Sequence, residues 1–155
     1  MNKQKRPSEP KRGSSRRKRP EVFVDRSLGR RKVPDALRAA GLDVTVIAHD
    51  DVFAQDTDDE VWLREAGRRG WIVLTKDEGI RRKPGEQRAI VDACVRCFCL
   101  HPTTGMRAED MATILTSALP RITAIAESHK RPGRVRLPHR PARTDTTPLP
   151  VTRGS

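Results

Sequence analysis

The sequence predicts a doubly wound α/β fold with a mostly parallel sheet of four to five strands. Two observations support this prediction. Short apolar runs alternate with longer segments that have helical spacing, and this order is typical of consecutive β-α-β units. Residues 71–75 are also apolar almost throughout, as expected of a parallel strand that helices cover on both faces.

Basic charge is concentrated at the two ends of the 155-residue chain. Residues 1–20 contain nine Lys/Arg and one Glu, and residues 129–155 contain seven Lys/Arg and one Asp, whereas the segment between them is nearly neutral. We interpret 1–20 as a disordered basic arm, 21–137 as one folded domain and 138–155 as a disordered Pro-rich tail. The basic arm either binds nucleic-acid phosphates or is only solvated.

The first half of the domain is predicted from its apolar runs and its helix boundary signals. Pro34 suits the first position of a helix and Gly41 suits its end. Thr57-Asp58-Asp59-Glu60 has the form of a capping box before an apolar helix face. In order, we expect a strand over 22–24, a helix over 34–41, a strand over 43–48, a loop over 49–56 and a helix from 57 to about 70.

The second half continues the alternation. Apolar residues at helical spacing predict a long helix over about 108–127, with Pro120 as a kink. A basic turn at 81–83 precedes a shorter helical pattern. In order, we expect a strand over 71–75, a helix over 85–93, a strand over 95–100, the long helix and a short last strand using Val135 and Leu137.

Three cysteines, Cys94, Cys97 and Cys99, fall on the predicted fourth strand. An extended strand points neighbouring side chains to opposite faces, so these residues and His101 would not converge on zinc. We interpret the cysteines as buried apolar side chains in a reducing compartment. No stretch approaches the roughly 20 apolar residues of a membrane span and no signal peptide is visible, which predicts a soluble, cytoplasmic protein without a membrane partner.

Three aspartates occur at the predicted boundaries of strands and helices. Asp25 ends the first strand, Asp58 opens the central helix and Asp77 follows the third strand. Because the carboxyl ends of parallel strands meet at one edge, these acids are expected to form one site. Clustered carboxylates favour Mg²⁺ or Mn²⁺, which could activate a water and neutralise the charge of a phosphodiester. The alternative is that the acids only cap turns and a helix.

Basic residues follow the first and third acids closely in the sequence. They are expected on the same rim as the carboxylates, where they could contact RNA phosphates on either side of the scissile bond. Solvated loop charges remain the alternative. The main candidate RNA contacts are Arg26, Arg30, Arg31, Lys76, Arg81 and Arg82, and Lys32 and Lys83 belong to the same basic segments.

Three segments also resemble a known family: 22–31 (VFVDRSLGRR), 57–63 (TDDEVWL) and 70–77 (GWIVLTKD). In this order and spacing they resemble the PIN-like domain of VapC-like toxins, over residues 21–137. The resemblance implies a doubly wound α/β fold, a Mg²⁺ or Mn²⁺ site and an endoribonuclease that cleaves RNA. It also implies a cognate antitoxin protein as partner, with a homodimer as a further option.

By position, Asp25 matches the family's first acid, Asp58 the acid at the central helix and Asp77 the acid of the Thr-x-Asp turn. Asp59 and Glu60 are close substitutes for Asp58, and Glu78 is a further helper. The resemblance leaves a fourth acid open among Glu78, Glu86 and Asp92, and with it a second metal ion.

Two functions from other classes remain open at this point. A receiver-like signalling domain also gathers acids and Mg²⁺ at strand ends, although Asp25 is followed by a basic residue rather than an acid. A non-catalytic nucleic-acid-binding domain would use the acids as caps and the basic arms for binding. Dependence of RNA cleavage on a divalent metal separates the nuclease from both alternatives.

Overall fold

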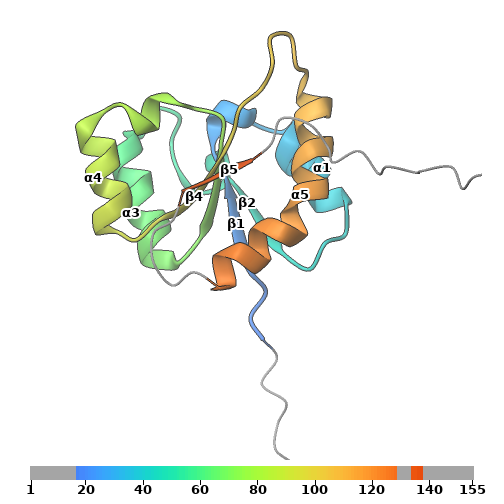
Figure 1. Ribbon diagram of the computed structural model, residues 1–155, viewed down its shortest axis with the longest axis horizontal. Coiled ribbons are helices and arrows are strands. Elements are labelled where there is room, and N and C mark those ends of the chain that lie inside the picture. Colours follow the sequence, from blue (N-terminus) through green and yellow to red (C-terminus); the bar gives the residue numbers. More distant parts are fainter. Residues whose placement is uncertain (1–16, 129–133, 138–155) are drawn as a thin grey trace, which may run out of the picture.

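The computed structural model describes residues 17–128 and 134–137 and forms one five-stranded sheet (Figure 1). All strand pairs are parallel, in the order β2-β1-β3-β4-β5. This confirms the predicted doubly wound parallel fold. The strands are β1 (Glu21–Val24), β2 (Thr45–Ala48), β3 (Ile72–Thr75), β4 (Arg96–Leu100) and β5 (Arg134–Leu137).

Helices cover both faces of the sheet. In Figure 1, α3 and α4 lie on one side of the strands, and α1 and α5 lie on the other. Short 3-10 turns follow β1 and β3. The helical elements are η1 (Arg26–Leu28), α1 (Lys32–Ala39), α2 (His49–Val52), α3 (Asp59–Arg69), η2 (Gly79–Arg81), α4 (Pro84–Asp92) and α5 (Ala108–Ser128).

The core is divided by the sheet into two apolar clusters. Successive side chains of β1 point to opposite faces, so Val22 and Val24 join the cluster with α1 and α5, while Phe23 joins the cluster with α3 and α4. Phe23 stacks on Trp71, with ring centroids 5.3 Å apart and planes at 8°, and also contacts Trp62. These rings fix the start of α3 against the centre of the sheet.

The register of the strands aligns the carboxyl ends of β1, β2 and β3. Val24 pairs with Ala48 of β2 and with Leu74 of β3, so the three strands end at nearly the same level. The Asp25 backbone N–H donates to the Leu74 carbonyl at 2.9 Å and continues the ladder by one residue. The residues after β1 and β3 therefore lie side by side.

Several element boundaries differ from the sequence predictions. Helix α1 begins at Lys32, two residues before Pro34, because its first turn closes with a hydrogen bond from the Asp35 N–H to the Arg31 carbonyl. The predicted loop over 49–56 was wrong in its first part, where α2 forms and the Phe53 N–H donates to the His49 carbonyl.

The predicted capping box and one cysteine also need correction. Asp58, not Thr57, is the N-cap residue of α3, and it makes no side-chain capping bond. Cys94 is exposed and precedes β4 with a φ of +53°, so the interpretation as a buried strand residue was wrong there. It is confirmed for Cys97 and Cys99.

Helix α5 matches the predicted long helix and runs through Pro120 without ending. Across 17–128 and 134–137, no helix has the length and hydropathy that crossing a membrane requires. The arm prediction for 1–16 and the tail prediction for 138–155 lie outside the described residues.

Candidate active site

Asp25 lies buried at the end of β1, with 3% of its surface exposed. Its Oδ2 accepts hydrogen bonds from Ser27 Oγ at 2.6 Å and from Thr75 Oγ1 at 2.8 Å. The two hydroxyls are 3.1 Å apart, and Ser27 Oγ also accepts from the Lys76 N–H. Hydroxyl donors from η1 and from β3 therefore hold the Asp25 carboxylate in a fixed orientation.

Asp77 occupies the turn that follows β3. Its backbone N–H donates to Thr75 Oγ1 at 3.0 Å, and its Oδ1 accepts from the Gly79 N–H at 2.6 Å. The Thr75 hydroxyl thus contacts Asp25 and the Asp77 backbone at once. This explains the chemistry of the Thr-x-Asp turn: the threonine connects the two acids that the sheet brings to one edge.

Of the two aspartates at the start of α3, Asp59 is the one whose carboxylate is held by other side chains. Its Oδ1 accepts from Arg26 Nη2 and from Trp62 Nε1, both at 2.9 Å, and its side chain is 17% exposed. Asp58 is exposed on the preceding turn. Since Arg26 directly follows Asp25, the Arg26–Asp59 pair connects the end of β1 to the start of α3.

An acid-lined cavity opens where α3 and α4 begin. Among the three candidates for a fourth acid, Glu86 lines this cavity, whereas Glu78 pairs with His101 and Asp92 lies close to Arg88 at the other end of α4. Glu86 is 5% exposed, and its Oε2 has no hydrogen-bond partner among the described residues. The cavity is lined by Arg26, Gln55, Asp56, Thr57, Asp58, Asp59, Glu60, Val61, Lys83 and Glu86.

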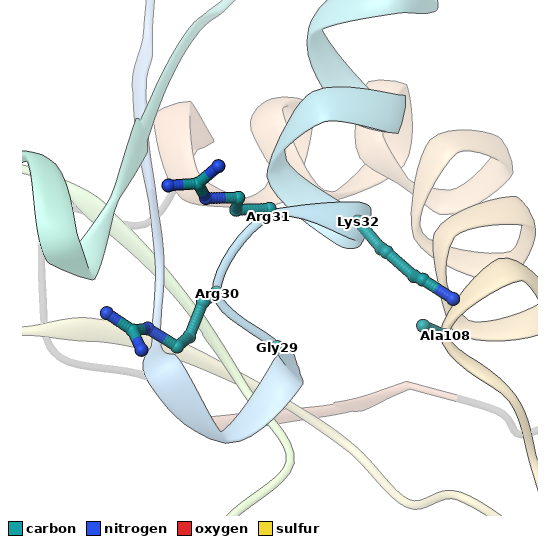
Figure 2. Close-up of a pocket in the computed structure, with 5 residues that line it drawn as sticks. All are labelled: Gly29, Arg30, Arg31, Lys32 and Ala108. Carbon is teal, nitrogen blue, oxygen red and sulfur yellow. The ribbon is translucent and has the colours of Figure 1, made fainter.

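The predicted RNA contacts lie in the loops around this edge, and they differ in what they bind. Arg30 pairs with Asp50 at 2.6 Å, which lowers the pKa of that carboxyl. Figure 2 shows Arg30 and Arg31 pointing to the same side of the loop between η1 and α1, whereas Lys32 points toward α5 and Ala108. Arg31 is exposed and therefore accessible to an anion.

The remaining predicted contacts belong to the segments after β1 and β3. The Arg26 guanidinium donates hydrogen bonds to Asp59 and to the Gln55 carbonyl. Lys76 is half-buried directly after β3, and Arg82 is exposed with its guanidinium 3.6 Å from Glu78. Arg81 lies in η2.

The donor set at this edge has the chemistry that a hard divalent cation prefers, but among the described residues not yet the spacing. Asp25, Asp59 and Asp77 supply carboxylate oxygens, and the unpartnered Glu86 Oε2 is a buried anionic oxygen. Within the described part of the chain, however, no three ligand-type side chains are close enough to hold one ion. Arg26 contacts Asp59, and Lys83 contacts Glu86, so protein cations sit beside the acids.

Comparison with known proteins decides the family. The model of a PIN-like domain matches residues 20–102, a segment that contains all of these acids. The chain belongs to the PIN-like domain family.

A relative of this PIN-like chain is the Mycobacterium tuberculosis (strain ATCC 25618 / H37Rv) protein named "Putative ribonuclease VapC45". The two are 37% identical over 114 residues, which cover 72% of this chain and 80% of the relative. No solved structure matches the chain.

Two residues that orient the candidate acids, Ser27 and Thr75, were not singled out from the sequence, and Glu86 was one of three acids left open. The hydroxyl of Thr75 could have been suspected from its place one residue before Lys76 and two before Asp77. Glu86 carries a weaker signal, because it precedes the buried Ala89 and Ile90 at helical spacing. Only the packing of α4 against α3 shows that its carboxylate lines the cavity.

Proposed function

We propose that this PIN-like chain is a Mg²⁺- or Mn²⁺-dependent endoribonuclease. The observation that carries the proposal is the buried Asp25 carboxylate, held by the Ser27 and Thr75 hydroxyls at the sheet edge that Asp77 shares. Family membership and the ribonuclease name of the mycobacterial relative support the same activity. The receiver-like alternative loses support because the chain belongs to a different family.

Each acid has a role in this proposal. Asp25, Asp59 and Asp77 would hold the cation, and Asp58 is the alternative for the second position. When bound, the cation would neutralise phosphate charge and favour deprotonation of an attacking water. The chain's own hydroxyls orient Asp25, while Lys76, Arg30 and the other loop cations would bind the phosphates beside the scissile bond.

The test is cleavage of labelled single-stranded and structured RNAs with Mg²⁺, with Mn²⁺ and with EDTA. Asp25→Asn keeps the size of the side chain and an oxygen that accepts from both hydroxyls, so the fold should persist. We expect cleavage to fall at least about 100-fold in this variant, because the anionic ligand is lost. Cutting at the wild-type rate by Asp25→Asn, or equal cutting in EDTA, would refute the proposal.

The choice between the neighbouring aspartates is tested in the same assay. Asp59→Asn is expected to lose far more activity than Asp58→Asn. Both aspartates line the cavity, but Asp59 is held by Arg26 and Trp62, whereas Asp58 is exposed. Thermal melts of both variants control for the loss of the Asp59–Trp62 hydrogen bond. A larger loss in Asp58→Asn would restore the assignment made from the sequence.

We further propose that the enzyme is the toxin of a toxin–antitoxin pair and that it acts in the cytoplasm. Support comes from the VapC name of the relative. Expression of the wild type should arrest growth, and co-expression of the protein encoded beside it should relieve the arrest. Growth arrest by Asp25→Asn equal to that of the wild type would separate toxicity from RNA cleavage and contradict this step.

A further inference from the structure

Lys83 belongs to the basic turn at 81–83, which the sequence places near the acids. It is the N-cap residue of α4 and lines the acid cavity. Its Nζ lies 3.0 Å from Glu86 Oε1, yet 67% of its side chain is exposed. An ammonium has three N–H donors, so one bond to Glu86 leaves donors that can face the cavity.

The backbone around Lys83 is held on both sides. The Lys83 N–H donates to the Gly79 carbonyl at 3.2 Å, and its carbonyl accepts from the Gln87 N–H at 3.1 Å. Pro84 at the first helical position fixes φ and gives α4 a defined start. The position of Lys83 relative to the cavity is therefore set by the fold rather than by a free loop.

Packing between the two helix starts fixes the cavity itself. A Cβ at Gly85 would lie 2.0 Å from Glu60 Oε1, so the carboxylate at the start of α3 occupies the space beside Gly85. Glu60 is exposed and its carboxylate is the end of a flexible side chain, so this contact can adjust. Helices α3 and α4 pack against each other, and this packing keeps the start of α4, and with it Lys83, next to the start of α3, where Asp59 lies.

Glu86 gives this lysine its orientation. A buried carboxylate is stable only when it is paired and hydrogen-bonded. The Lys83 ammonium is its ionic partner among the described residues, and Oε2 has no partner there. Glu86 therefore favours one position of the ammonium, at the wall of the cavity.

The positive charge of Lys83 is also stabilised by neighbouring carboxylates. Its pKa is raised, first by the hydrogen bond to Glu86 and further by the charges of Glu86, Asp59 and Asp77. The group stays cationic at and above neutral pH. Arg26 differs because its guanidinium is already bound to Asp59 and to the Gln55 carbonyl.

We propose that Lys83 binds a phosphate of the RNA substrate inside the acid cavity and that Glu86 is its positioning residue. An exposed, oriented ammonium among carboxylates offsets the repulsion that a phosphodiester meets there. The cleavage part of this inference rests on the proposed nuclease function. The phosphate contact itself can be measured without catalysis.

The experiment is binding of a labelled single-stranded RNA in EDTA at several salt concentrations. Lys83→Met is expected to raise Kd about fivefold at low salt and to reduce the slope of log Kd against log salt by about 0.7, the value for one phosphate contact. Lys83→Arg should keep most of the affinity. Arg68→Met is the matched control: it removes a cation of similar exposure, 69%, from the far end of α3.

The effect of Glu86→Gln on RNA affinity distinguishes two roles for Glu86, because the two roles predict changes of opposite sign. If Glu86 were only a negative charge near the RNA, its removal would tighten binding. If it positions Lys83, binding should weaken, by about twofold or more, although the net charge has become more positive. Thermal melts show whether each variant is folded, and Lys83→Gln replaces the methionine variant if that one is not.

The outcomes separate this inference from the proposed function. Wild-type slope and Kd in folded Lys83→Met, or a loss equal to that of Arg68→Met, would overturn the role of Lys83. That result would stand even if the wild type cleaves RNA normally. Conversely, a wild type that cuts no RNA refutes the nuclease while the Lys83 effect on binding is still read directly.

Discussion

Thr75→Val is the substitution that tests the site architecture most directly. Valine keeps the shape of the buried threonine but removes the hydroxyl. That hydroxyl donates to Asp25 Oδ2 at 2.8 Å and accepts from the Asp77 N–H at 3.0 Å. The change therefore leaves the packing of β3 intact and removes a hydrogen bond to a buried carboxylate.

The magnitude follows from these contacts. A hydrogen bond to a charged group contributes roughly 1.5–3 kcal/mol, and Asp25 retains only its Ser27 donor from the pair of hydroxyls. Asp77 is only partly buried as a residue, so its N–H can bond to water after the change and we expect it to add little. We expect Thr75→Val to lower the free energy of unfolding by about 2–3 kcal/mol and to lower cleavage as well, because Asp25 is no longer held from β3.

Urea unfolding at neutral pH measures this effect, and a double-mutant cycle with Ser27→Ala measures the coupling. Because both hydroxyls bond the same Oδ2 and lie 3.1 Å apart, the two changes should not be additive. Thr113→Val is the control, since its hydroxyl bonds an exposed carbonyl on α5, and it should change stability by less than about 0.5 kcal/mol. Equal small effects of Thr75→Val and Thr113→Val would refute the reasoning.

Three further changes test other parts of the chain. Gly67→Ala should destabilise by about 2–3 kcal/mol in urea, although alanine favours helices, because its Cβ would lie 2.2 Å from the Ala93 carbonyl oxygen; a gain in stability would contradict this packing. The pKa of Glu65 is lowered to about 2, chiefly by Arg68, from a usual value of 4.5, so its stabilisation is complete above pH 4.5 and is lost as the pH falls toward 2. In thermal melts from pH 7 to pH 2, Glu65→Gln should therefore melt below the wild type at pH 7 and converge with it at pH 2, and a constant difference would be inconsistent. Deleting residues 2–20 should weaken RNA binding and flatten its salt dependence, and an unchanged slope would exclude a binding role for the arm.

The sequence was sufficient to predict the order of the strands and of the longer helices, because apolar runs of strand length and apolar positions at helical spacing reflect the two faces of a parallel sheet. It missed the short helix α2. It also placed Asp25 and Asp77 at one edge, since both directly follow strands. It could not choose between Asp58 and Asp59. Neighbouring residues at a helix start differ in direction by about 100°, and the buried Trp62, three residues after Asp59, holds the Asp59 carboxylate through its Nε1.

The same reasoning applies to Glu86 and to the lysine that pairs with it. Glu78, Glu86 and Asp92 are equivalent as sequence acids, but Glu86 alone among them precedes Ala89 and Ile90 at the spacing of the buried face of α4. The burial of its carboxylate then requires an oriented cation, which Lys83 supplies from the preceding turn. Periodicity could suggest that Glu86 points inward. Periodicity could not show that the Glu86 side chain lines a cavity between the starts of α3 and α4.

Strand order explains why the site forms between β1 and β3. The chain leaves β1 through η1 toward α1 on one face of the sheet, and it leaves β3 through η2 toward α4 on the other face (Figure 1). At such a switch point the two connections diverge and leave a crevice at the carboxyl ends of the strands. Asp25 lies on one side of this crevice and Thr75 on the other, and their hydrogen bond joins the two strands there. Asp25 and Asp77 are thus held by the central strand pair of the fold, while Arg26 and Lys83 lie in the diverging connections, where the proposed substrate contacts would form.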